Sequence, residues 1–375
     1  MMRLSVLAAL LSLGVAQHSP DARGTLLPNG KRWGTFDVES KVLFDKANVF
    51  ASQDIELLAS GFRWTEGPLS TPQGLLFTDT IQDRIYLYDG EVSVALEKAG
   101  GGAKDVFFGP GANGLAYRDD ETLLVCQHGA QRVVALDATD FHLKSIVASE
   151  TPKGDRFNSP NDVCVVGNKA YFTDPTYGFL LKGTSGIYPK NVEEKGLPDD
   201  QPYLDELSLV SGAKGEKGIY AVDLETSKIE LISTALDRPN GIGFFRNHLW
   251  VANSAVNNCS WYAFDLETNE IVKTISWDSL DVDMGPGLID GFEFDLATGL
   301  LWSSAPGGVI VVDTDKGEAV AAAKFGLNIA NLAFGKGKNH KFPQDDVFVT
   351  GLGHLWRLKK HVSVLHHHKG QEDEL

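Results

Sequence analysis

The chain has 375 residues, of which 43% are hydrophobic and 22% are charged, a composition typical of a globular protein with a large buried core. Its formal net charge of −16 argues against nucleic acid as a partner and against an anionic membrane surface, and it is compatible with a bound cation. Residues 1–16, with one arginine before an almost wholly apolar run, predict a secretory signal peptide. That run is shorter than the roughly 20 residues of a membrane-spanning helix, and no other stretch is long enough, so we expect no membrane span.

The segments on either side of the main body are interpreted separately. Residues 17–54 contain mixed signals, and we expect a leader segment that crosses the surface or closes the fold. Residues 361–375 form a polar tail whose last four residues resemble the retrieval signal of the endoplasmic reticulum, with Glu372 where Lys or His is usual. We therefore expect a protein of the secretory pathway, either secreted or retained in the endoplasmic reticulum.

Cysteines and a glycosylation signal fit the same route. The odd number of cysteines, Cys126, Cys164 and Cys259, permits one disulfide with one free thiol, or three thiols. The segment Asn258-Cys259-Ser260 matches the glycosylation sequon, which predicts a glycan on Asn258.

Residues 55–360 repeat one pattern six times. Each copy opens with a residue that carries a side-chain oxygen and continues with three or four short apolar strands separated by turns; the openers are Glu66, Asn113, Asn161, Asn240, Asp290 and Asn331. Four of the five intervals between openers match the roughly 40–50 residues of a propeller blade, and the long third interval contains an insertion, Lys182–Lys217, that could cover a site. We predict an all-β, six-bladed β-propeller with four-stranded blades around a central metal-binding tunnel.

The six openers are candidates for a metal site. In a propeller the first strand of each blade lies nearest the axis, so residues at equivalent positions of these strands form a ring. Here every member of the ring offers an oxygen, which suits a hard cation such as Ca²⁺. A single Asn-Gly pair is most often a turn, but six separate turns would not need an oxygen at the same position.

These motifs resemble those of the gluconolactonase, regucalcin (senescence marker protein) and luciferin-regenerating enzyme family. The resemblance extends from about Phe62 to Leu358, and it rests on the segments Trp64-Thr65-Glu66-Gly67-Pro68, Cys126-Gln127-His128-Gly129, Asn158-Ser159-Pro160-Asn161-Asp162-Val163, Tyr171-Phe172-Thr173-Asp174-Pro175-Thr176-Tyr177-Gly178, Arg238-Pro239-Asn240-Gly241 and Ile289-Asp290-Gly291.

The resemblance implies one divalent metal in the tunnel, commonly Ca²⁺ and sometimes Zn²⁺, and hydrolysis of a sugar lactone by attack of water on the metal-polarised carbonyl. It implies that the metal ligands are Glu66, Asn161, Asn240 and Asp290, and that Asp290 is also the catalytic acid or base. Four further residues are expected to contact the substrate: Asn113, His128, Asp174 and Tyr177.

Two other functions stay open at this point. The same metal ring could serve a phosphotriesterase-like or arylesterase-like hydrolase, so the expected partner is a small-molecule lactone or ester. Alternatively, the chain could be a non-catalytic Ca²⁺-binding propeller that binds a ligand or a partner, because a fold alone does not decide function.

Overall fold

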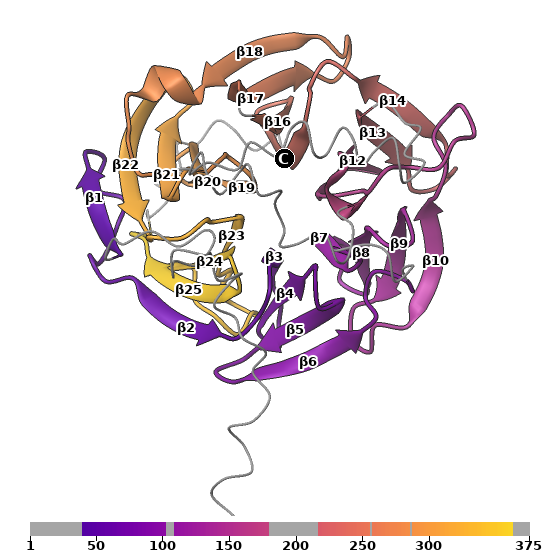
Figure 1. Ribbon diagram of the computed structural model, residues 1–375, viewed down its shortest axis with the longest axis horizontal. Coiled ribbons are helices and arrows are strands. Elements are labelled where there is room, and N and C mark those ends of the chain that lie inside the picture. Colours follow the sequence, from indigo (N-terminus) through magenta and orange to yellow (C-terminus); the bar gives the residue numbers. More distant parts are fainter. Residues whose placement is uncertain (1–39, 103–108, 180–216, 256, 286, 363–375) are drawn as a thin grey trace, which may run out of the picture.

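The computed structural model describes residues 40–102, 109–179, 217–255, 257–285 and 287–362, and it is a ring of six antiparallel β-sheets around a central axis (Figure 1). This confirms the predicted six-bladed propeller. Within the described ranges, helical structure is limited to two short 3-10 turns, η1 (Tyr177–Phe179) and η2 (Trp277–Leu280). No helix in this part of the chain is long and apolar enough to cross a bilayer.

Each blade begins at the axis and ends at the rim. Blade one comprises β3 (Thr65–Ser70), β4 (Leu75–Asp79), β5 (Arg84–Tyr88) and β6 (Val92–Glu97); blade two comprises β7 (Ala112–Asp119), β8 (Thr122–Gln127), β9 (Arg132–Asp137) and β10 (Leu143–Ala148). Blade three comprises β11 (Val163–Val166), β12 (Lys169–Asp174), β13 (Gly218–Asp223) and β14 (Ile229–Ser233); blade four comprises β15 (Pro239–Phe245), β16 (His248–Ala255), β17 (Asn258–Asp265) and β18 (Ile271–Ser276).

The last two blades recruit strands from the beginning of the chain. Blade five comprises β19 (Phe292–Asp295), β20 (Leu300–Ala305), β21 (Gly308–Asp313) and β22 (Glu318–Lys324), and β1 (Lys41–Asp45) adds a fifth strand at its rim. Blade six comprises β23 (Asn331–Phe334), β24 (Asp346–Gly351) and β25 (His354–Lys359), with β2 (Glu56–Ser60) as its outer strand. Because β2 precedes blade one in the chain, its pairing with β25 closes the ring by backbone hydrogen bonds.

Apolar side chains fill the wedges between neighbouring blades. Trp302 of blade five lies edge-on to Phe334 of blade six, with ring centroids 5.8 Å apart, and Trp250 of blade four packs against Phe294 of blade five. Both faces of middle strands such as β8 and β21 are therefore buried, which explains why these strands are largely apolar, whereas the outer strands β6 and β10 are mostly exposed. This packing holds the six inner strands in fixed positions around the axis.

Several predicted segments lie outside the described residues. They include the signal peptide (residues 1–16), residues 363–375 of the tail, and nearly all of the insertion, whose ends join β12 to β13. The segment 17–54 is described only from residue 40 onward, and that part contributes β1.

Candidate functional site

The inner strands bring the six predicted openers to equivalent places around the axis. Each opener lies on an inner strand or within two residues of its start: Glu66 on β3, Asn113 on β7, Asn161 before β11, Asn240 on β15, Asp290 before β19 and Asn331 on β23. Each inner strand packs against the inner strands of both neighbouring blades, so the openers form a continuous ring. Glu66 and the four asparagines are buried, with at most 6% of their surface exposed, and Asp290 is half-buried.

Glycines allow the neighbouring inner strands to approach closely. In blades one, two, four and five the residue after the opener is a glycine: Gly67, Gly114, Gly241 and Gly291. A Cβ added to any of these glycines would overlap the opener of the next blade or the residue beside that opener. The Gly114 N–H also donates to the carbonyl of Asn161, with 2.7 Å between N and O. The glycine after each of these openers therefore allows close contact between neighbouring blades, in addition to forming a local turn.

Three carboxylates from alternate blades face one another across the tunnel. Burial raises the pKa of Glu66 to about 8, and the negative charge of Asp162 adds to this increase. Burial raises the pKa of Asp162 to about 7. Burial also raises the pKa of Asp290 well above its usual value, and the charges of Glu66 and Asp162 raise it further. A cation between these carboxylates would favour their ionised forms.

Asp162 was not among the ligands predicted from the sequence. It follows the opener Asn161, at the position where the other copies up to blade five have glycine, and the Asn331 amide donates to its carboxylate, with 3.2 Å between Nδ2 and Oδ2. The Asn331 oxygen accepts from the N–H of Leu332 at 2.8 Å. Asn331 thus presents N–H groups to the tunnel, and Asp162 supplies carboxylate oxygens there. Asn161 is the one opener that is followed by a carboxylate, and this feature of the sequence could have identified Asp162 as part of the site.

The orientation of the Asn240 amide leaves its oxygen available. The Ser254 hydroxyl donates to the carbonyl of Ile289, with 2.5 Å between the oxygens, so it can only accept from the Asn240 NH₂ group, at 3.0 Å. The Asn240 Oδ1 atom is buried and has no partner among the described residues, and the same is true of Asn113 Oδ1. Buried oxygens without partners cost free energy unless a ligand satisfies them.

These observations fit a hard divalent cation. The predicted ligands Glu66, Asn161, Asn240 and Asp290 lie in one ring, two of them are carboxylates, and the Asn240 oxygen has no other partner in the described structure. Oxygen donors of this kind are those that Ca²⁺ prefers. Their assignment as ligands stays a prediction.

The second strand of several blades ends on a polar residue that holds the loop leading to the opener. The Asp174 carboxylate accepts from the N–H of Asn158 at 2.8 Å, and the Asn253 amide oxygen accepts from the N–H of Arg238 at the same distance. Ser304 accepts from the N–H of Asp290 itself, at 2.9 Å. These hydrogen bonds fix the conformation of the backbone at, or just before, the ring residues.

The three remaining residues predicted to contact substrate have different surroundings. Asp174 is fully buried, and burial raises its pKa to about 8. Tyr177, on η1, is half-buried; its hydroxyl donates to the carbonyl of Ser254 at 3.5 Å, and its ring lies 6.0 Å from the Arg238 guanidinium carbon. His128 is buried beside Asn113, and burial lowers its pKa to about 4. Their contact with substrate stays a prediction.

The sequon and the cysteines can also be placed. Asn258 is exposed at the start of β17, and its side-chain oxygen accepts from the hydroxyls of Ser260 and Tyr262. Cys126, Cys164 and Cys259 are all free thiols, so the alternative with one disulfide is wrong.

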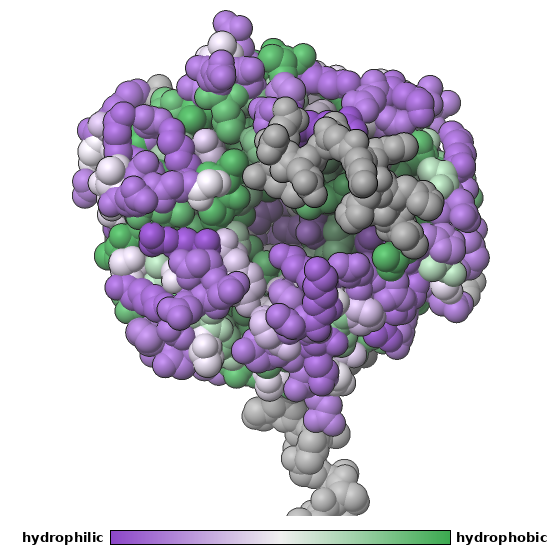
Figure 2. Space-filling view, turned by 180° about the vertical axis from the view of Figure 1, so that it is seen from behind, coloured by the Kyte–Doolittle hydropathy of each residue, from purple (hydrophilic) through white to green (hydrophobic). Residues whose placement is uncertain are grey.

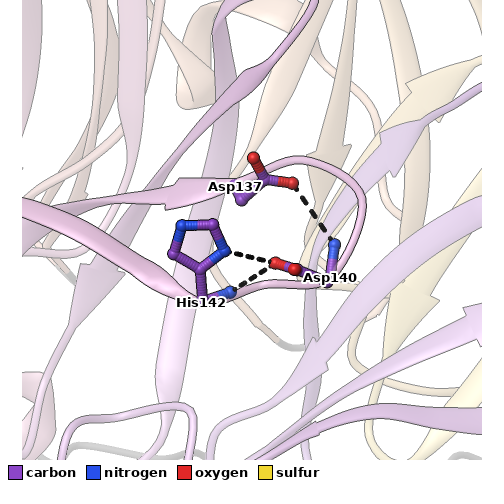
Figure 3. A group of neighbouring side chains, drawn as sticks. All are labelled: Asp137, Asp140 and His142. Carbon is purple, nitrogen blue, oxygen red and sulfur yellow. Dashed lines mark hydrogen bonds and ion pairs between the residues drawn. The ribbon is translucent and has the colours of Figure 1, made fainter.

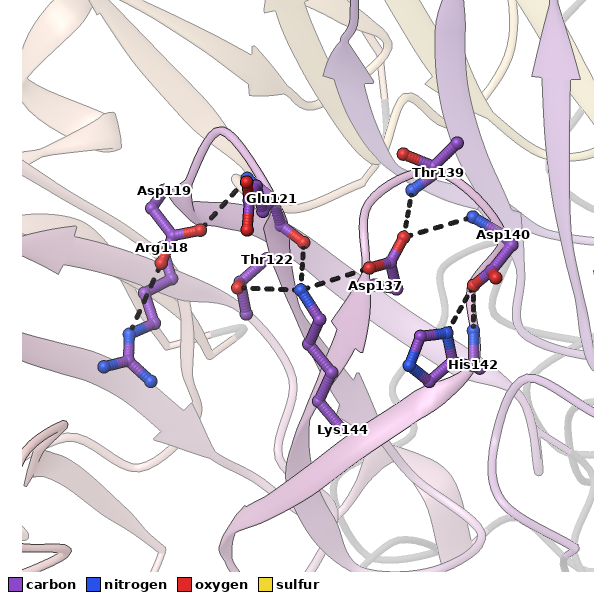
Figure 4. Close-up of polar contacts among 9 residues, drawn as sticks. All are labelled: Arg118, Asp119, Glu121, Thr122, Asp137, Thr139, Asp140, His142 and Lys144. Carbon is purple, nitrogen blue, oxygen red and sulfur yellow. Dashed lines mark hydrogen bonds and ion pairs between the residues drawn. The ribbon is translucent and has the colours of Figure 1, made fainter.

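A separate acidic group lies at the rim of blade two (Figure 3). In the part of the chain that the structure describes, one group of three acidic or histidine side chains has its ligand atoms within 4.8 Å of one another: Asp137, Asp140 and His142. The Asp137 carboxylate accepts from the N–H groups of Thr139 and Asp140, and it pairs with Lys144 at 3.2 Å (Figure 4). These bonds lower the pKa of Asp137 to about 2.

The same turn recurs in other blades. Asp223, Asp265 and Asp313 also end the third strand and accept from the backbone of the following turn. The rim group is therefore a repeated turn structure whose carboxylates are already engaged, and it is distinct from the axial ring.

A cavity of about 360 Å³ occupies the tunnel below the ring. Inner strands of all six blades line it, Asp162 and Asn331 border it, and its other polar lining residues include Glu293 and Lys336. The face of the propeller that is turned away in Figure 1 is hollowed at its centre, with hydrophilic residues in the hollow (Figure 2).

Comparison with known proteins gives consistent matches. The model of the "SMP-30/Gluconolactonase/LRE-like region" family matches residues 64–342. A gluconolactonase of Zymomonas mobilis subsp. mobilis is 29% identical over 304 residues, which cover 76% of this chain and 77% of that protein.

Two solved structures share the fold. A gluconolactonase of Xanthomonas campestris has a TM-score of 0.64 at 24% identity, over 87% of this chain and 97% of that chain. Regucalcin of Agrobacterium tumefaciens, a calcium-binding protein, has a TM-score of 0.51 at 17% identity, over 86% of this chain and 98% of that chain.

Proposed function

Because the chain belongs to the SMP-30/gluconolactonase/LRE-like family, as its motifs predicted, we propose that it is a divalent-metal-dependent lactonase that opens a sugar lactone. The observation that carries the proposal is the axial ring, in which the carboxylates of Glu66 and Asp290 share the ring with buried amide oxygens that have no hydrogen-bond partner among the described residues. A purely structural ion would not require these groups to border a tunnel. This argues against the non-catalytic alternative, and the likeness to a gluconolactonase favours a lactone over an aryl ester as the substrate.

The cation would be held by Glu66, Asn161, Asn240 and Asp290. When bound, it would supply Lewis-acid polarisation of the lactone carbonyl, a contribution of several kcal/mol to transition-state stabilisation. The two ligand carboxylates balance a divalent charge, and oxygen-only ligation favours Ca²⁺ over softer metals. Asn331 holds the third carboxylate, Asp162, by a hydrogen bond.

Asp290 is positioned to accept the proton of the attacking water. Its backbone N–H is held by Ser304, and a hydrogen bond from Asn240 to its carboxylate opposes the increase in its pKa. A positioned base of this kind contributes roughly 10²–10⁴-fold to a rate. The proton that Asp290 accepts is then available for the alkoxide that leaves as the lactone ring opens.

The proposal is tested by a pH-stat assay of aldonolactones, lipophilic lactones and aryl esters, with and without a chelator. We expect aldonolactone hydrolysis that the chelator abolishes and added Ca²⁺ restores. Chelator-sensitive cleavage of aryl esters alone would favour the arylesterase alternative. No chelator-sensitive hydrolysis of any substrate would favour the non-catalytic propeller.

Asp290→Asn tests the role of Asp290 as the catalytic base, and an unfolding measurement tests separately whether the variant still folds. We expect turnover to fall by roughly 10²-fold or more, because the amide cannot accept the proton. The urea unfolding midpoint of the chelator-treated variant should be no lower than that of the wild type, because asparagine has nearly the same shape and removes a negative charge that faces Glu66 and Asp162. Near-normal turnover would show that another group is the base.

We also propose that the protein enters the secretory pathway and carries a glycan on Asn258. The residue is exposed at the start of a strand, and the hydrogen bonds from Ser260 and Tyr262 go to its side-chain oxygen and not to the nitrogen that a glycan would modify. Endoglycosidase treatment of the protein from eukaryotic cells should increase its electrophoretic mobility, and Asn258→Gln should remove that shift. Equal mobility before and after treatment would refute the modification.

A further inference from the structure

His128 has no acid–base task in the proposed reaction, yet it is buried beside one of the ring residues. It lies directly after β8, and its backbone N–H donates to the carbonyl of Gly111 at 3.1 Å. On the opposite side it packs against η1, where a Cβ added to Gly178 would be only 2.8 Å from the His128 Cβ. The backbone and the Cβ of His128 are therefore held between the segment just before β7 and η1.

The hydrogen bonds of the ring define its tautomer. Nδ1 lies 3.3 Å from the carbonyl oxygen of Gly109, and a carbonyl can only accept, so Nδ1 carries the proton. In a neutral imidazole Nε2 is then an acceptor. Burial lowers the pKa of His128 to about 4, which agrees with a neutral ring.

The tautomer of His128 in turn defines the orientation of the Asn113 amide. Nε2 lies 3.4 Å from the amide nitrogen Nδ2 of Asn113, and because Nε2 accepts, the NH₂ group must donate to it. The opposite orientation would place two acceptors against each other. The Asn113 oxygen is consequently turned away from His128, and it is buried with no partner among the described residues.

We infer that His128 is a positioning residue that turns the Asn113 amide oxygen toward the tunnel, where it accepts a hydrogen bond from a hydroxyl group of the substrate. The inference rests on the proposed lactonase function and assigns one hydrogen bond by which that site would select sugar lactones over lactones without hydroxyl groups. A site with a buried acceptor discriminates strongly against an analogue that lacks the matching hydroxyl, because that acceptor then stays unsatisfied.

The experiment compares a six-membered aldono-δ-lactone with δ-valerolactone, which has the same lactone ring but no hydroxyl or hydroxymethyl substituent. In His128→Leu and in Asn113→Leu we expect kcat/KM for the aldonolactone to fall by about 10–100-fold, and kcat/KM for δ-valerolactone to change by less than about 3-fold. His128→Gln should stay within about 3-fold of the wild type on both substrates, because the glutamine oxygen can accept from Asn113.

His354→Gln is the matched control. Like His128, His354 donates from Nδ1 to a backbone carbonyl, that of Leu352, but it is half-buried and belongs to blade six. This substitution should leave the ratio of kcat/KM for the two lactones unchanged. Urea unfolding of all four variants identifies any that fail to fold.

A second measurement does not depend on activity. A long-range ¹H–¹⁵N correlation spectrum of the folded wild-type protein should show His128 as the neutral Nδ1–H tautomer, and finding the Nε2–H form would overturn the inference. Equal losses on both lactones, or a glutamine variant as impaired as the leucine variant, would also overturn it while the lactonase proposal stands. A wild-type protein that hydrolyses no lactone would overturn both.

Discussion

The close approach of neighbouring inner strands predicts a specific weakness at Gly291. A Cβ at this position would overlap the side chain of Asn331, and the backbone of Gly291 does not lie in the left-handed region, so Gly291→Ala adds a steric conflict without backbone strain. Overpacking of this kind costs about 1–3 kcal/mol. If Asn331 moves away, the N–H of Leu332 loses its acceptor, which costs about 1–3 kcal/mol more.

We therefore expect Gly291→Ala to lower the free energy of unfolding by about 2–6 kcal/mol. Urea unfolding of the chelator-treated protein measures this change without a contribution from a bound cation. Gly109→Ala is the control, because a Cβ there would come no closer than 3.9 Å to any atom of the described residues outside its chain neighbours, the nearest atoms being those of Thr80. The expected change is within about 0.5 kcal/mol. If the two variants unfold at the same urea concentration, the glycine is not required for contact between the blades.

Two further predictions concern charge. Asp162→Asn removes one of three facing carboxylates whose pKa is raised, so the metal-free protein should become more stable above about pH 4. The affinity of the variant for Ca²⁺, measured by calorimetry, should decrease. If both the stability and the affinity are unchanged, Asp162 is not part of the site. The folded-state pKa of His128, about 4, lies below its unfolded value, so the unfolded chain binds a proton first as the pH falls, and stability decreases by up to roughly 3 kcal/mol between about pH 6.5 and 4. His128→Gln should remove this part of the decrease in a series of urea midpoints, and parallel curves for the two proteins would contradict the burial of a neutral imidazole.

The repeat made most of the fold predictable. Alternating apolar runs and turns, with an oxygen-bearing residue at each opening, gave the number of blades, the order of strands and the positions of Glu66 and Asp290 on the ring. Such features are local, because each blade is one supersecondary unit whose pattern is written in consecutive residues. The closure of blade six by β2 was not predicted in detail, since it joins residues 56–60 to 354–357.

The sequence by itself determined the fold class, the family and the set of openers. Only the tertiary structure decided what each opener presents to the axis. Asn331 is engaged by Leu332 and Asp162, and Asp162 joins Glu66 and Asp290. The oxygens of Asn113 and Asn240 have no partner in the part of the chain that the structure describes. The physical reason is that an amide has a donor end and an acceptor end. Which end faces the tunnel depends on neighbours such as His128 and Ser254, which only folding brings into contact.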